Sequence, residues 1–171
     1  MFDSVLIVCA SLASPAMAEG LWVGIYRHDV TLAQQKSETG RDIKLGWIGG
    51  PIATLDSIGR PAPHILISKS LNGGTDYVAA GLNWTFGSKL YVRPGIGLSA
   101  NNGPRPAYRN GRRVDLGSPI TFELELAAGW RINPKIALEA SWIHLSHATL
   151  FSRQNRGMDS MGLRMIYHFS R

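Results

Sequence analysis

Apolar and polar residues alternate with a period of two along most of this 171-residue chain after its first 18 residues. The clearest stretch runs from Ile120 to Ile132. One side of it carries apolar residues, namely Ile120, Phe122, Leu124, Leu126, Ala128, Trp130 and Ile132. The other side carries small or charged residues, namely Thr121, Glu123, Glu125, Ala127, Gly129 and Arg131. Because alternate side chains of a strand point to opposite faces, this stretch predicts a β-strand with one apolar face.

Clusters of Gly, Pro, Asn and Asp divide the alternation into eight segments of strand length. We expect strands at about 20–31, 41–49, 63–71, 76–86, 89–99, 119–132, 135–146 and 160–169. Several of these segments have the ~10 residues that a tilted strand needs to cross a bilayer. The sequence therefore predicts a single all-β domain over residues 19–171, an eight-stranded antiparallel transmembrane β-barrel.

The two faces of the expected strands differ in the way that a membrane barrel requires. The polar face is small and charged, and its Glu and Arg side chains can pair inside a narrow barrel. The apolar face carries aromatic residues near strand ends, such as Trp84, Trp130 and Trp142, which is typical of an aromatic girdle at a membrane interface. A soluble β-barrel or sandwich, which would bury the apolar face, is the alternative.

Loop lengths predict the orientation. Gly87-Ser88 and 133–135 form tight turns, whereas the connections 100–118 and 147–159 are long. Short turns belong on the periplasmic side of such barrels, so we expect the long loops outside and both termini in the periplasm. The link at about 50–62 is an exception, because it falls on the periplasmic side and is not short.

The first 18 residues have the pattern of an export signal. An apolar stretch from Val5 to about Ala13 precedes Ala16-Met17-Ala18, a small-x-small cleavage site. We expect residues 1–18 to be a cleaved signal peptide. Cys9, the single cysteine, would leave with it, so the mature chain would form no disulfide and no thiolate metal site.

Charge indicates the class of partner. Loss of Asp3 with the signal peptide raises the formal net charge from +6 to +7. Such a balance favours an anionic partner, namely nucleic acid, lipid head groups or polysaccharide, and export argues against nucleic acid.

The loop 100–118 concentrates this charge. Four arginines, Arg105, Arg109, Arg112 and Arg113, stand there with Asp115 as the single acid. Guanidinium groups suit phosphate geometry, and lipopolysaccharide phosphate is the dominant anion at the outer surface. We expect these arginines to bind lipopolysaccharide phosphate, and a solvated charged loop is the alternative.

A possible hydrolytic site follows from the rule that every second residue of a strand lies on the same face. His144 and Ser146 continue the apolar row of segment 135–146, and the row of the last strand, extended backwards, reaches Asp159. The two strands are neighbours, so the three side chains could meet on one outer surface as the parts of a Ser-His-acid triad. A position in the head-group zone, where His and Ser need no function, is the alternative. A metal site from His144, His147 and Asp159 is disfavoured, because residues three apart on a strand point to opposite faces.

Residues from about 89 to 169 resemble the lipid A 3-O-deacylase family of outer-membrane barrels, also called acyloxyacyl hydrolases. The matching motifs are Arg93-Pro-Gly-Ile-Gly-Leu98, Leu116-Gly-Ser-Pro-Ile-Thr-Phe122, His144-Leu-Ser146, Asn155-Arg-Gly-Met-Asp159, Gly162-Leu-Arg164 and Tyr167-His-Phe169. The first half of the chain agrees mainly in its barrel pattern.

The resemblance implies a carboxylic ester hydrolase that removes the 3-linked hydroxyacyl chain of lipid A, a component of lipopolysaccharide, in the outer membrane. Ser146 would be the nucleophile, His144 the general base, and Asp159 the group that orients His144. The site would lie on the outer wall of the barrel, so that substrate enters laterally from the outer leaflet. No metal or organic cofactor is implied, and a homodimer is left open.

The chain departs from the family pattern near the expected nucleophile. The family's Asn after the Ser is His147 here, and its Gly two residues further on is Thr149. We expect these two residues at the oxyanion, where loss of one donor reduces the rate by ~10²–10³. Asp159 is also shorter than the Glu of the best-known members. A weak or inactive enzyme therefore stays open, and the alternative function is a non-catalytic barrel for envelope integrity, adhesion or lipopolysaccharide binding.

Overall fold

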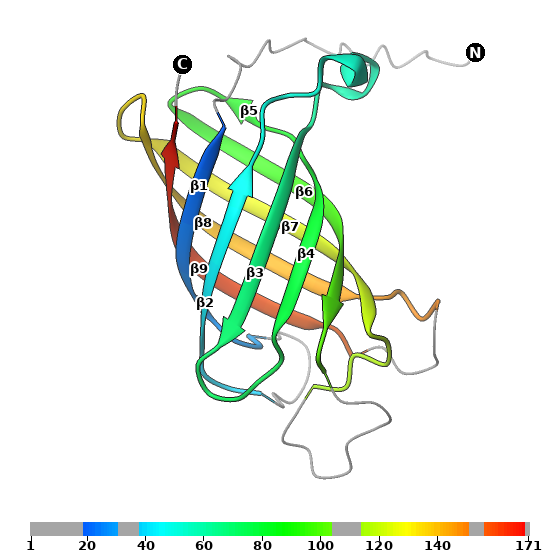
Figure 1. Ribbon diagram of the computed structural model, residues 1–171. Coiled ribbons are helices and arrows are strands. Elements are labelled where there is room, and N and C mark those ends of the chain that lie inside the picture. Colours follow the sequence, from blue (N-terminus) through cyan, green and yellow to red (C-terminus); the bar gives the residue numbers. More distant parts are fainter. Residues whose placement is uncertain (1–18, 31–37, 104–113, 151–155, 170–171) are drawn as a thin grey trace, which may run out of the picture.

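The computed structural model describes residues 19–30, 38–103, 114–150 and 156–169. Long antiparallel strands form a closed barrel (Figure 1). They are β1 Gly20–Arg27, β2 Arg41–Ile48, β3 Ala62–Ser70, β4 Tyr77–Asn83, β6 Leu90–Asn101, β7 Ile120–Arg131, β8 Ile136–Ser146 and β9 Met158–His168. Pairing of β1 with β9 and of β4 with β6 closes the sheet, which removes the exposed edges of an open sheet. The predicted eight-stranded antiparallel barrel is confirmed.

One predicted strand is interrupted. The segment expected at 76–86 splits into β4 and a two-residue strand, β5 Phe86–Gly87, both of which pair with β6 in the same register. Trp84 donates its N–H to the carbonyl of Pro94 at 2.9 Å. Proline has no N–H to return, so the ladder is broken at this point although the chain stays extended.

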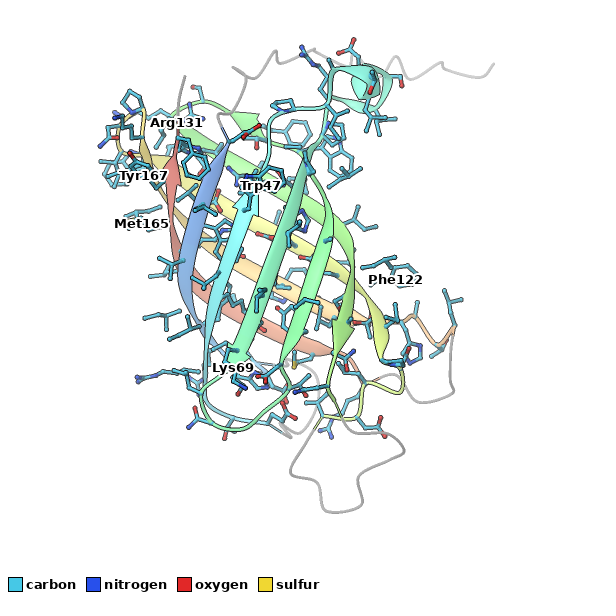
Figure 2. All side chains as sticks on the ribbon, in the orientation of Figure 1. Trp47, Lys69, Phe122, Arg131, Met165 and Tyr167 are labelled. Atoms are coloured by element: carbon cyan, nitrogen blue, oxygen red, sulfur yellow. The ribbon has the colours of Figure 1, made fainter. Side chains whose placement is uncertain are left out.

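The apolar side of each strand faces outward, as predicted. Leu124, Leu126 and Trp130 of β7 are exposed, whereas Glu123 and Glu125 between them are buried. Phe122 and Met165 also point away from the barrel (Figure 2). The soluble alternative is wrong for this chain, because its apolar face covers the outside of the barrel.

Ion pairs fill the middle of the barrel. Arg164 of β9 bonds to Glu139 of β8 at 2.5 Å and also pairs with Glu125 of β7. Arg93 of β6 lies 3.1 Å from Glu139. These side chains are almost fully buried, and a buried charge is tolerated only when it is paired. The charged face therefore fills the interior as predicted, and its ion pairs link the four neighbouring strands β6 to β9.

The two ends of the barrel differ. The turn end carries the β5–β6 and β7–β8 turns, and the loop end carries the connections 28–40, 71–76, 102–119 and 147–157. The β2–β3 link lies at the turn end and folds as a 3-10 helix, η1 Ala53–Ile58, in agreement with the exception noted in the sequence. Among the described residues, none of the helical segments is long and apolar enough to cross a membrane.

A buried polar cluster joins the connections at the loop end. The two ring nitrogens of His28 lie 2.6 Å from a carboxylate oxygen of Asp42 and 2.5 Å from one of Glu38. Both nitrogens must donate to acceptor-only carboxylates, so His28 is an imidazolium. Glu38 in turn accepts bonds from the N–H groups of Thr75 and Val114. One glutamate thereby ties together three of the connections.

The cluster shifts the pKa of both groups. Burial alone would lower the pKa of His28, but the hydrogen bonds and charges of Asp42 and Glu38 outweigh it and raise the pKa to about 9. Burial would raise the pKa of Glu38, but the bonds from His28, Thr75 and Val114 lower it to about 2. Each partner is therefore held in its charged form across the neutral range.

Removal of one buried charge is expected to destabilise the barrel. Arg164→Met leaves Glu125 without its guanidinium partner and Glu139 with Arg93 alone, and loss of one partner from a buried pair costs about 3–5 kcal/mol. Urea unfolding in micelles, followed by heat-modifiable gel mobility, measures the change. Arg60→Met is the matched control, because the exposed pair of Arg60 with Asp56 is worth less than about 1 kcal/mol. Equal losses for the two variants would contradict the ion-pair account.

The His28 cluster predicts a pH dependence. The pKa of His28 is raised from 6.5 to about 9, so its contribution to stability is complete below pH 6.5 and is lost as the pH rises toward 9. In His28→Gln this decline should disappear, and the free energy of unfolding should be lower at pH 6 than in the wild type. Urea midpoints at intervals between pH 6 and pH 9 test it. If the urea midpoints of wild type and His28→Gln change with pH in parallel, His28 is not the titrating group.

Candidate active site

His144 and Asp159 meet on the outer wall near the loop end. They are directly opposite each other in the pairing of β8 with β9. Nδ1 of His144 lies 2.8 Å from Oδ1 of Asp159, and both side chains are partly exposed. The structure thus brings together two of the three residues proposed from strand parity, as a hydrogen-bonded His-carboxylate dyad.

Trp142 supports the dyad, although its pattern in the sequence indicated only a girdle residue. Its indole N–H donates to the same Oδ1 of Asp159 at 3.0 Å. Its ring also stacks on the His144 imidazole, with centroids 5.8 Å apart and planes inclined by 25°. Trp142 precedes His144 by two positions on β8, so both side chains point outward. The carboxylate is held by two donors, and this restricts the orientation of both partners.

Gly157 allows the β8–β9 loop to approach the imidazole. Its φ of +70° lies in the left-handed region that favours glycine, and a Cβ there would lie 3.0 Å from Cε1 of His144. The backbone of Gly157 therefore covers one side of the ring near Nε2. In the sequence this glycine was visible only as part of the family-like motif that ends at Asp159.

Ser146 ends β8 on the same outward-facing row as His144. The two residues are two positions apart on one strand, which corresponds to roughly 7 Å between their Cα atoms. Ser146 is partly exposed, opposite Phe122 of β7. Among the described residues, no hydrogen bond joins Ser146 to His144. The structure thus places the serine on the same face as the dyad, two residues from His144 along β8.

A tight turn follows Ser146. His147 is fully buried, as is Leu145 two positions earlier, so its side chain lies on the opposite side from Ser146. Ala148 and Thr149 have φ values of +50° and +60°, which are unfavourable for a β-branched residue such as threonine. Thr149 is exposed, and its hydroxyl donates to the carbonyl of Ala148 at 2.6 Å. Of the two expected oxyanion residues, only Thr149 is on the exposed side.

Other expected residues lie outside the described part of the chain. These are the signal peptide at 1–18 and the four loop arginines, Arg105, Arg109, Arg112 and Arg113. Asp115, the acid of the same loop, is described and buried, and it accepts a bond from the N–H of Gly117.

A shallow apolar hollow of about 1100 Å³ lies on the outer wall, on the turn-end side of the dyad. Ala128 and Ala140, which are paired across β7 and β8, form part of its lining. Larger outward-facing residues around them, including Val92 and Leu163, form its sides. Ala140 is four residues from His144 along β8, roughly 13 Å, so the hollow shares the wall of the dyad and is separated from it by Trp142. Its apolar lining is suited to a hydrocarbon chain.

One group inside the barrel has donors of the kind that bind metals. Ligand atoms of His64, Glu123 and Glu125 lie within 4.8 Å of one another, and all three residues are buried. Nε2 of His64 is already 3.2 Å from Glu123, and Glu125 is paired with Arg164. These contacts account for the group as part of the interior ion network.

Comparison with known proteins identifies a family. The profile described as lipid A 3-O-deacylase (PagL) matches residues 42–168, which is most of the chain. The crystal structure of the outer membrane enzyme PagL superposes with a TM-score of 0.64 and 20% identity, over 87% of this chain and 99% of that one. No curated protein sequence matches the chain.

Two further barrels share the architecture. Neisserial surface protein A (NspA) superposes with a TM-score of 0.61 at 14% identity, over 91% of this chain and 99% of that one. The N-terminal β-barrel domain of Pseudomonas aeruginosa OprF gives 0.57 at 9% identity, over 91% and 100%. At such identities these likenesses establish the fold alone.

Proposed function

The chain belongs to the lipid A 3-O-deacylase family, and we propose that it hydrolyses the 3-linked hydroxyacyl ester of lipid A in the outer leaflet of the outer membrane. The observation that carries this proposal is the hydrogen-bonded pair of His144 and Asp159, on the lipid-facing wall and beside Ser146. Polar side chains that face lipid cost desolvation free energy, so their presence on this wall supports a functional role.

In the proposed mechanism, Nδ1–H of His144 donates to Asp159, which leaves Nε2 free to act as the base. Oγ of Ser146 bonds to the ester carbonyl carbon while Nε2 takes the hydroxyl proton. The C–O bond to the sugar then breaks, and its oxygen receives that proton. Water, activated in the same way, releases the hydroxy fatty acid from Ser146. Asp159 stabilises the imidazolium in both steps.

The absence of a Ser146–His144 hydrogen bond among the described residues is compatible with this mechanism. Catalytic hydrogen bonds are often loose in a free enzyme and shorten when substrate binds. Trp142 and Asp159 hold the imidazole, so the serine side chain is the part that must rotate. We assign the oxyanion contact to Thr149, whose hydroxyl would leave the Ala148 carbonyl, because the side chain of His147 is buried.

Substrate binding is proposed to use two surfaces. The acyl chain would lie along the outward-facing wall, in the apolar hollow beside Trp142. The loop arginines Arg105, Arg109, Arg112 and Arg113 would contact phosphate above it. In this arrangement the loop end faces the outside of the cell, and residues 1–18 would serve as the cleaved signal for export.

A non-catalytic barrel is the second candidate function. The absence of a Ser146–His144 hydrogen bond among the described residues favours it, as do His147 and Thr149 in the turn that follows. On this view the chain binds lipopolysaccharide or supports the envelope, and lipid A stays intact when the chain is expressed.

The two candidates differ in their effect on lipid A. Mass spectrometry of lipid A from cells that express the chain should show loss of one 3-hydroxyacyl group. Ser146→Ala and His144→Ala should each abolish the loss, while Ser88→Ala, which changes an exposed serine at the turn end, should keep it. Loss in Ser146→Ala would place the nucleophile elsewhere. Intact lipid A with every variant, although gel mobility shows folded barrels, would favour the non-catalytic function.

Trp142 is expected to act as a positioning residue. Trp142→Phe keeps the stacked ring but removes the indole donor to Asp159, so kcat should fall about tenfold, which corresponds to one lost hydrogen bond to a charged group. KM should stay within about twofold, because the contact is with the dyad and not with substrate. Micellar kinetics on purified lipid A measure both values. A rise in KM at unchanged kcat would instead assign Trp142 to substrate binding.

A further inference from the structure

Two arginines stand opposite each other on the outer wall at the loop end. Arg27 ends β1 and Arg41 begins β2, and the two residues are directly paired in the sheet. Both are exposed and lie on the apolar, outward-facing side of their strands. Like charges in directly opposed positions destabilise a sheet. An anion bound between the two guanidinium groups would relieve this repulsion.

Neither arginine is paired with an acidic side chain in the part of the chain that the structure describes. Among the described residues, no ion pair involves Arg27 or Arg41, and the neighbouring Lys69 is paired with Asp76 instead. The sequence of the loop segments outside the described part, 31–37, 104–113 and 151–155, contains no Asp or Glu. These segments contain a lysine and five arginines, so they add positive charge to the sequence and no carboxylate.

The backbone holds the pair in place. The N–H of Arg41 donates to Oδ1 of Asn72 at 3.0 Å, and its carbonyl accepts from the N–H of Leu71 at 2.8 Å. A hollow of about 660 Å³ lies beside the arginines. Its lining includes exposed apolar residues, Ile25 and Leu71, together with Arg27, Arg41 and other polar residues. Such a surface suits a ligand with a hydrocarbon part and an anionic head.

We propose that Arg27 and Arg41 form a phosphate-binding subsite for a phosphorylated glycolipid of the outer leaflet. The inference rests on the proposed function, in which that glycolipid is lipid A. Arg27 is paired with Met161, which is two residues beyond Asp159 on β9. The subsite thus lies two to three strands from His144, roughly 10–15 Å along the wall. A head group bound there extends toward the dyad.

This subsite is distinct from the loop arginines. Arg27 and Arg41 belong to paired strands, so their separation is fixed by the sheet and does not depend on a loop. Each guanidinium can donate two parallel hydrogen bonds to one phosphate. The subsite therefore fixes both the lateral position and the depth of the sugar relative to Ser146, in addition to supplying affinity.

Kinetics with two substrates test the subsite. The full chain, folded in micelles, is given lipid A with both phosphates and lipid A from which both have been removed. Arg27→Gln with Arg41→Gln should raise KM about tenfold for the phosphorylated substrate, leave kcat within about twofold, and leave KM for the phosphate-free substrate unchanged. Lys89→Gln with Lys135→Gln removes the same charge at the turn end and should change neither value. An equal KM effect on both substrates would overturn the subsite.

A binding measurement separates this inference from the deacylase itself. In the Ser146→Ala background, native mass spectrometry counts the phosphorylated glycolipid that the barrel retains, and the two Gln substitutions should reduce retention about tenfold. If retention depends on the arginines but the wild type releases no fatty acid, the subsite stands and the deacylase proposal fails. If the wild type hydrolyses lipid A but neither KM nor retention changes in the double Gln variant, the subsite is wrong and the deacylase proposal stands. Equal arginine-dependent retention of phosphatidylglycerol would reduce the site to a general anionic-lipid contact and overturn the assignment.

Discussion

The bond between Glu139 and Arg164 determines where the candidate site can form. These residues are paired across β8 and β9, and both must face the interior, because either charge would be costly in lipid. A shift of one residue in either strand would turn its charge outward. The same register, five residues along each strand, sets His144 opposite Asp159 on the outer wall. Buried ions thus fix the alignment of a dyad that they never touch.

The interior of this barrel is filled by ion pairs, and the proposed catalytic groups lie on its outer face. Arg93, Arg164, Glu125 and Glu139 occupy the space that a wider barrel would leave for a channel. The interior is therefore packed with side chains, and the proposed route of the substrate is along the outer wall. At the loop end, Glu38 joins three connections through one carboxylate.

The sequence was sufficient for the fold because period-two alternation and turn residues determine strands, faces and order. The strand expected at 63–71 formed as β3, and the gap at Trp84 follows from the missing N–H of Pro94. The alternation of side chains along the strands also predicted His144, Ser146 and Asp159 on one face. It could not place the turn after Ser146, where left-handed residues break the alternation and His147 is buried. Nor could it reveal the Trp142 bond to Asp159 or the His28 cluster, which depend on cross-strand contacts and side-chain rotamers.

The position of the dyad on a rigid strand has a consequence for selectivity. A site within a cleft distinguishes substrates by shape, but His144 and Asp159 lie on an open wall with lipid beside them. What such a site fixes is a depth in the bilayer, because the strand cannot slide without exposing its buried charges. If the proposed function holds, lipids whose ester bonds lie deeper or shallower than this level stay out of reach, however closely their chains match. The thickness of the surrounding leaflet would then help to determine which bond is cut.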